Sequence, residues 1–226
     1  MLFRSHDKCM NVMPLCHINS TFYTFTFTYI GGSAYIHPAR SFRPEEILEI
    51  IERHKITFIS LIPTHYNLIL NLSQEKRNRD VSSVRKLLCS SAPARKQTKL
   101  AVMEFFKGVE LYEAYGSTEA FIVTILKPED QLRKLGSIGH EVAGADMIKL
   151  LDDSGAAVGP GEVGELYSRG PMLFDGYYNL PEKTIESFRD GWFSAGDMAV
   201  MDEDGFYAIV DRSEEHTSEL QSLLII

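Results

Sequence analysis

The stretch LYEAYGSTEA, residues Leu111–Ala120, decides the fold, because an apolar run ends there in glycine, hydroxyl and carboxylate residues. Val109, Leu111 and Tyr112 are typical of the end of a buried strand. Gly116 then predicts a turn, since glycine adopts backbone angles that residues with a Cβ resist. The sequence therefore predicts a strand that ends in a polar loop.

The residues of this loop offer the groups that a nucleotide requires. Ser117 and Thr118 bring hydroxyl donors beside backbone N–H groups, and Glu119 brings a hard oxygen ligand of the kind Mg²⁺ prefers. Tyr115 supplies a flat π face for a planar base. The alternative is an ordinary strand-to-loop turn with solvated polar residues, because short motifs also match by chance.

Composition limits the class of protein to which the loop belongs. The chain has 226 residues, of which 44% are hydrophobic and 24% charged, which is typical of one large or two small globular domains. A net charge of -8 with scattered lysines and arginines argues against nucleic acid as a partner. The most apolar stretch, residues 22–36, is short and interrupted, so we expect no integral membrane segment. Three cysteines without a CxxC pair, and no signal peptide, favour a cytoplasmic protein.

Helix and strand patterns alternate ahead of the polar loop. Pro44, followed by Glu45, Glu46 and regularly spaced apolar residues, predicts the start of a helix. We expect further helices at residues 66–72 and 95–106, and strands at residues 12–17, 56–62, 84–89 and 109–112. Alternation of this kind predicts a parallel sheet with a site at the carboxyl ends of its strands.

The segment Phe22–Tyr29 fits two patterns at once. Its alternation of aromatic residues and threonine favours a strand, whereas Phe22, Phe25 and Tyr29 also share one helical face. These residues alone leave both possibilities open.

Short strands separated by turns follow Ala120. We expect them at residues 121–126, 146–151, 164–168, 198–201 and 206–210. Asp202–Gly205 predicts a hairpin between the last two. This region should be mainly antiparallel, either sheet-like or barrel-like.

Three motifs in order resemble those of the AMP-forming acyl- and aryl-CoA synthetases of the adenylate-forming superfamily. Tyr115–Glu119 matches the YGxTE motif, and Gly164–Pro171 with Gly176-Tyr177-Tyr178 matches a second motif. Gly191–Asp197, followed by Asp204–Arg212, matches a third, although Ala195 replaces the usual threonine. The resemblance extends from about Val12 to Arg212.

The resemblance implies an α/β fold like the large N-terminal domain of an acyl-CoA synthetase. A parallel α/β layer would span residues 1–120, and a β-rich, distorted barrel-like part would span residues 121–211, both packed around a shared cleft. It also implies that Phe22–Tyr29 is a helix, and we follow it on this point.

The resemblance also implies roles for single residues. Tyr115 would stack on adenine, Thr118 would contact the α-phosphate and Glu119 would bind Mg²⁺. Further nucleotide contacts would come from Ser91, Ala92, Pro93, Gly116, Ser117, Asp197 and Arg212, with Asp197 and Arg212 on the ribose. For Asp197 the alternative is a plain turn aspartate.

His17 matches the histidine of the family's PLxH motif, near the acyl pocket, and would be a catalytic residue together with Thr118 and Glu119. A hydrogen-bonded core histidine explains His17 equally well.

Two parts of the family pattern are missing from the sequence. The glycine-rich phosphate loop should precede the PLxH segment, and a small C-terminal domain with a catalytic lysine should follow Arg212. Residues 213–222, SEEHTSELQS, together with Arg212 resemble a translated sequencing adapter. We therefore expect an internal fragment of the large domain, with residues 212–226 as a non-native tail.

The activity implied is that of an ATP-dependent acid–thiol ligase, which forms an acyl-adenylate and then an acyl-CoA thioester. Its partners would be a small-molecule carboxylic acid, ATP and CoA, with Mg²⁺ as the metal. The alternatives are an adenylating enzyme that loads a carrier protein or another acceptor, and a non-catalytic remnant. The chain as written is expected to be inactive, and its sequence identifies neither the acid nor the oligomeric state.

Overall fold

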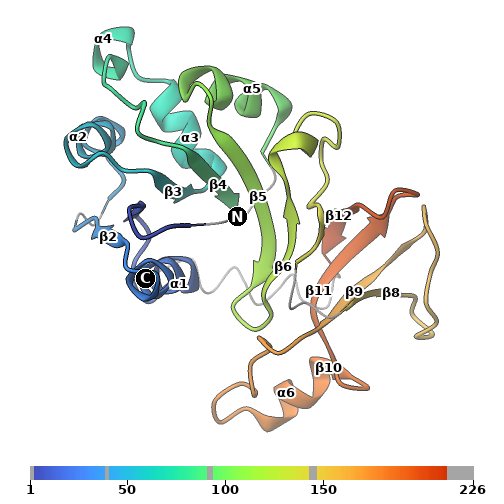
Figure 1. Ribbon diagram of the computed structural model, residues 1–226. Coiled ribbons are helices and arrows are strands. Elements are labelled where there is room, and N and C mark those ends of the chain that lie inside the picture. Colours follow the sequence, from blue (N-terminus) through green and yellow to red (C-terminus); the bar gives the residue numbers. More distant parts are fainter. Residues whose placement is uncertain (1–2, 39–40, 91–93, 143–146, 213–226) are drawn as a thin grey trace. The chain divides into compact units, whose positions relative to one another are not determined.

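The computed structural model describes residues 3–38, 41–90, 94–142 and 147–212 (Figure 1). The chain divides into two compact units, the first comprising Met1–Glu113 and Lys127–Leu135, and the second Ala114–Leu126 and Gly136–Ile226. The first unit contains a parallel sheet with helices, and the second is mainly antiparallel. The predicted α/β class, with an α/β layer and a β-rich part, is confirmed.

Strands and helices alternate in the first unit. Its strands are β1 (Lys8–Asn11), β2 (Ser33–Ile36), β3 (Phe58–Leu61), β4 (Lys86–Ser90) and the start of β5 (Glu110–Ser117), in the order β2-β1-β3-β4-β5. The pairs β1–β2, β1–β3 and β3–β4 are parallel, as predicted. The helices are α1 (Ile18–Tyr29), α2 (Pro44–His54), α3 (Pro63–Leu70), α4 (Gln74–Arg77), α5 (Lys96–Phe105) and the 3₁₀ helix η1 (Pro128–Asp130).

Both faces of this sheet are covered. Ile59 and Leu61 of β3 pack in a cluster with residues of α2, α3 and α5. Phe58 points to the other face, because side chains alternate along a strand, and it contacts Tyr23 and Phe27 of α1. A strand buried on both faces has a continuous apolar sequence, which is why residues 56–62 predict β3 well.

Helix α1 confirms the helical prediction for Phe22–Tyr29. Tyr23 and Phe27, four residues apart, are buried, whereas Phe25 and Tyr29 are 69% and 92% exposed. Packing of one helical face on the sheet therefore outweighs the strand propensity of the alternating threonines.

The strand predicted at Val12–His17 is wrong, because β1 ends at Asn11 and residues 15 and 16 form a turn. Pro14 has no N–H to donate to a neighbouring strand. The buried pair Cys9 and Met10 forms the interior of β1 instead.

The second unit contains the end of β5 with β6 (Phe121–Leu126) and β7 (His140–Glu141). Its other strands are β8 (Met147–Leu151), β9 (Val163–Arg169), β10 (Phe188–Arg189), β11 (Trp192–Met201) and β12 (Tyr207–Arg212), with the helix α6 (Pro181–Glu186) ahead of β10. These five strands form an antiparallel sheet in the order β10-β11-β9-β8, and β12 pairs with β11 through the predicted hairpin. No helix in the described residues has the length and apolar character that crossing a membrane requires.

Candidate active site

The hairpin of β5 and β6 carries the polar loop predicted from the sequence. Strand β5 continues through Gly116 to Ser117, so the turn lies at Thr118–Ala120, and the prediction of a turn at Gly116 is wrong. A Cβ on Gly116 would overlap the carbonyl oxygen of Phe121. The backbone angle φ of Gly116 is not positive; the residue of this hairpin with a positive φ, of 61°, is Phe121. Glycine is needed here for the close approach of two strands.

The two hydroxyl residues of the loop have different surroundings. Ser117 Oγ accepts a hydrogen bond of 3.0 Å from the N–H of Ala120, which closes the turn. Thr118 is exposed at the tip of the hairpin. Thr118 is therefore the hydroxyl more accessible to a ligand.

Tyr115 and Asp197, from separate motifs, meet in the second unit. The hydroxyl of Tyr115 donates a hydrogen bond of 2.7 Å to Asp197 Oδ2. Tyr115 is only partly buried, against the cluster that contains Phe193 and Tyr207. The structure thus brings the predicted adenine-stacking ring and the predicted ribose-binding carboxylate together.

A β-bulge in β11 positions Asp197. The register of β11 against β9 shifts between Ser194 and Met198, and Gly196 takes a φ of 77°. The N–H of Gly196 donates to Ser194 Oγ at 2.9 Å, which fixes the bulge. Bulges often occur next to active sites, where they change the direction of a side chain. The bulge in β11 therefore sets the direction of the Asp197 side chain.

Glu165 supports this bulge, a role that the sequence analysis missed. Ser194 Oγ donates to Glu165 Oε1 at 2.6 Å, and the hydroxyl of Tyr167 donates to Glu165 Oε2 at 3.0 Å. Burial, together with the hydrogen bond to Glu165, raises the pKa of Tyr167. Both Glu165 and Ser194 lie inside matched motifs, which was the signal available in the sequence.

Glu119 is held by a second loop of the same unit. Its carboxylate oxygen Oε1 accepts a hydrogen bond of 2.9 Å from the hydroxyl of Tyr177. Its backbone carbonyl accepts one of 2.8 Å from the N–H of Phe174. Tyr177 belongs to the matched Gly176-Tyr177-Tyr178 segment, but its sequence position alone indicated no role for its side chain.

One carboxylate, that of Glu119, is enough for a Mg²⁺ ion that also binds substrate phosphates, but not for a metal ion whose ligands all come from the protein. Among the described residues, no three His, Cys, Asp or Glu side chains gather as a metal site. In nucleotide sites, however, Mg²⁺ is bound by one or two carboxylates plus substrate phosphates. With Oε1 engaged by Tyr177, Oε2 is the oxygen that fits a metal.

The other predicted site residues are located as follows. The backbone of Arg212 lies opposite that of Asp197 in the register of β12 with β11. Ser91, Ala92 and Pro93 lie outside the described residues. His17, in the first unit, is the N-cap residue of helix α1, and its Nδ1 accepts a hydrogen bond of 3.2 Å from the N–H of Asn19.

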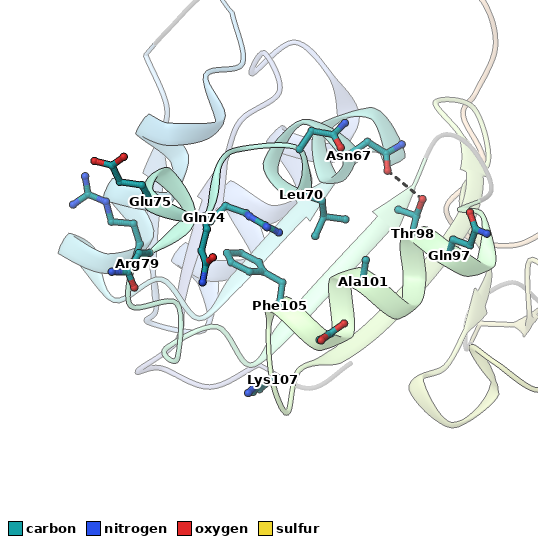
Figure 2. A pocket seen from close by; sticks show the side chains of 14 residues that line it. Asn67, Leu70, Gln74, Glu75, Arg79, Gln97, Thr98, Ala101, Phe105 and Lys107 are labelled. Atoms are coloured by element: carbon teal, nitrogen blue, oxygen red, sulfur yellow. Dashed lines mark hydrogen bonds between the residues drawn. The ribbon is translucent and has the colours of Figure 1, made fainter.

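A groove of about 1220 Å³ lies on the helices of the first unit. Figure 2 shows Asn67 of α3 hydrogen-bonded to Thr98 of α5, at 3.1 Å, with Phe105 further along the same groove. Its lining is rich in amide and charged side chains, and it includes none of the predicted site residues.

Comparisons with known proteins agree with these motifs. The model of the AMP-binding enzyme family matches residues 1–178. A feruloyl-CoA synthase from Amycolatopsis sp is 35% identical over 93% of this chain and 42% of its own length. A medium/long-chain-fatty-acid–CoA ligase from Mycobacterium tuberculosis is 38% identical over 93% of this chain and 36% of its own length. The chain thus spans less than half the length of these curated relatives.

The solved structures include a close match in fold. The o-succinylbenzoate coenzyme A synthetase from Bacillus subtilis, in complex with AMP, has a TM-score of 0.82 and is 30% identical over 93% of this chain and 42% of that chain. The same enzyme in complex with ATP and magnesium ion also has a TM-score of 0.82, at 29% identity over 99% of this chain and 47% of that chain. The family match over most of the sequence and this shared fold show that the chain belongs to the family of AMP-binding enzymes.

Proposed function

We propose that this chain carries the nucleotide-binding residues of an ATP-dependent acid–thiol ligase. In the first step, an oxygen of a carboxylic acid attacks the α-phosphorus of ATP, the bond to the bridging oxygen breaks, and pyrophosphate leaves. In the second, the sulfur of CoA attacks the acyl carbon, and AMP leaves with the electrons of the broken C–O bond. The CoA ligases among the relatives support this choice of acceptor.

The observation that carries the proposal is the hydrogen bond between Tyr115 and Asp197. A nucleoside presents a flat base and two adjacent ribose hydroxyls. A tyrosine ring suits the base, and a carboxylate suits the hydroxyls as an acceptor of charge-assisted hydrogen bonds. Since the phenol holds one oxygen of Asp197, the carboxylate has a fixed orientation for the ribose.

Thr118 and Glu119 lie in the turn directly after β5, the strand that carries Tyr115. A nucleotide stacked on the Tyr115 ring would therefore have its phosphates near these two residues. We assign Thr118 as a hydrogen-bond donor to the α-phosphate and Glu119 as the Mg²⁺ ligand. A metal ion at this position stabilises the negative charge that the phosphates carry in the transition state. Gly116 and Ser117 contribute by shaping the hairpin on which these two side chains stand.

We assign His17 to the acyl side of the reaction. Because Nδ1 accepts a backbone N–H, the proton of the neutral ring is on Nε2, which is the nitrogen available to a ligand. A cytoplasmic location completes the proposal, and it is supported by three cysteines that are all free thiols.

The test is a calorimetric titration of the chain with AMP. Asp197→Ala removes the ribose contacts, and a hydrogen bond to a charged group accounts for roughly tenfold or more in affinity, so a loss of about that size is expected. Asp153→Ala is the matched control, because Asp153 is an exposed aspartate in the turn after β8 of the same unit. If the unaltered chain bound no AMP, or if both variants bound AMP equally well, the proposed function would be contradicted.

A further inference from the structure

We infer that Tyr177 is a positioning residue for the metal-binding carboxylate of Glu119, an inference that rests on the proposed function. Its hydroxyl donates to Glu119 Oε1 at 2.9 Å, which leaves Oε2 to face a metal ion. Tyr177 would touch neither nucleotide nor metal, and it would act through Glu119 alone.

The loop that contains Tyr177 is attached to the turn of the β5–β6 hairpin at two points. Besides the phenol bond, the N–H of Phe174 donates to the backbone carbonyl of Glu119 at 2.8 Å. The backbone contact fixes the main chain of Glu119, and the phenol contact fixes its carboxylate group. A glutamate side chain has several rotatable bonds, so two such contacts select one of many conformations.

The ring of Tyr177 is itself anchored. It packs edge-to-face on Phe174 with ring centres 4.8 Å apart, and Phe174 in turn packs on Phe193 at 5.3 Å. The N–H of Tyr177 donates to Thr184 Oγ1 at 2.9 Å. The hydroxyl therefore stands on a rigid aromatic support, and little conformational freedom is lost when it holds the carboxylate.

A phenol also suits this position chemically. It is a neutral donor, so it orients the carboxylate without cancelling the negative charge that attracts Mg²⁺. A lysine or arginine in its place would compete with the metal for that charge. The nearby Lys183 lies over the ring of Tyr177, with its Nζ 5.2 Å from the ring centre.

Tyr177→Phe tests the inference in the full chain, because it removes only the hydroxyl. We expect its affinity for MgATP to fall about three- to tenfold, the range for one hydrogen bond, while its affinity for metal-free AMP stays within about twofold of the original. A purely structural role would weaken both affinities together. Tyr178→Phe is the control, because the neighbouring Tyr178 is 91% exposed and should change neither affinity.

A double variant shows whether Tyr177 acts through Glu119. Glu119→Gln should weaken MgATP binding, and adding Tyr177→Phe to it should cause no further loss, since contacting residues are not additive. An additive loss, equal MgATP affinity in Tyr177→Phe and the unaltered chain, or an equal fall in AMP affinity would each overturn the inference and leave the proposed function standing. Failure of the unaltered chain to bind either nucleotide would overturn both.

Discussion

The phenol of Tyr115 and the carboxylate of Asp197 are joined by a 2.7 Å hydrogen bond, although 82 residues separate them in sequence. Tyr115 stands on the β5–β6 hairpin, and Asp197 lies in the bulge of β11. Each half of the contact is thus fixed by its own local backbone feature. This contact joins residues of two sequence motifs in one candidate site.

Removing only the hydroxyl of Tyr115 should weaken AMP binding moderately. Tyr115→Phe keeps the stacking face but removes its hydrogen bond to Asp197, and one hydrogen bond of this kind corresponds to about 1 kcal/mol, or roughly fivefold in affinity. Calorimetric titration with AMP measures the effect. Tyr112→Phe, which removes a phenol bonded to Glu110 at 2.9 Å in the same strand, is the control and should bind AMP normally. Identical affinities for the two variants would show that the Tyr115–Asp197 contact does not serve the nucleotide.

Gly116→Ala should destabilise the fold strongly. The added methyl group would overlap the carbonyl of Phe121, and the hairpin must open to accommodate it. Overpacking of this kind costs about 1–3 kcal/mol in the free energy of unfolding, measured by urea denaturation, and a clash with backbone atoms should lie at the upper end of that range. Gly159→Ala serves as the comparison, since the nearest atom to its Cβ, Glu162 Oε2, would be 3.6 Å away. A similar small loss in both variants would refute the close-approach explanation.

The buried pair of Lys99 and Glu113 should be costly to break from one side. Lys99 Nζ lies 2.6 Å from Glu113 Oε2, both residues are buried, and Glu113 also accepts the N–H of Ala94 at 3.1 Å. Lys99→Met leaves a buried, unpaired carboxylate, at a cost of about 3–5 kcal/mol in unfolding free energy. Glu113→Gln added to it removes the charge and retains an acceptor for Ala94, so part of the stability should return. Urea denaturation of both variants measures their free energies of unfolding. A double variant less stable than Lys99→Met would contradict this account.

The three cysteines should differ in reactivity and in their effect on stability. Cys9 and Cys89 are buried, and burial raises the pKa of each thiol to about 12, with the nearby carboxylate of Glu113 contributing at Cys89. At pH 8, a thiol reagent should therefore label only the exposed Cys16 in the folded chain, and all three cysteines in urea.

The same raised pKa values predict how stability changes in alkali. Between the ordinary cysteine pKa and about 12, the folded state keeps protons that the unfolded state loses. The free energy of unfolding should then fall as pH rises above about 8.5, by up to roughly 1.4 kcal/mol per pH unit for each buried thiol. Cys9→Ala should reduce this slope, as urea denaturation at several pH values would reveal. An unchanged slope would contradict the assignment to Cys9.

The sequence by itself determined the class of the fold and most of its elements. Continuous apolar runs predict β3 and β4, and Pro44 with two glutamates predicts the start of α2, because these signals are local. The same holds for the antiparallel part, where the Asp202–Gly205 turn predicts the pairing of β11 with β12. The family followed from the motifs, since their order along the chain is a property of the sequence alone.

Only the tertiary structure decided what the side chains of those motifs contact. The contacts of Tyr115 with Asp197 and of Tyr177 with Glu119 join residues far apart in the chain, and no local pattern encodes a partner at such separation. Gly116 shows the same limit, because the carbonyl that excludes a side chain there becomes visible only once β5 and β6 pair. Local sequence signals determine where strands and helices form, whereas the geometry of the site depends on packing between segments that lie far apart in the sequence.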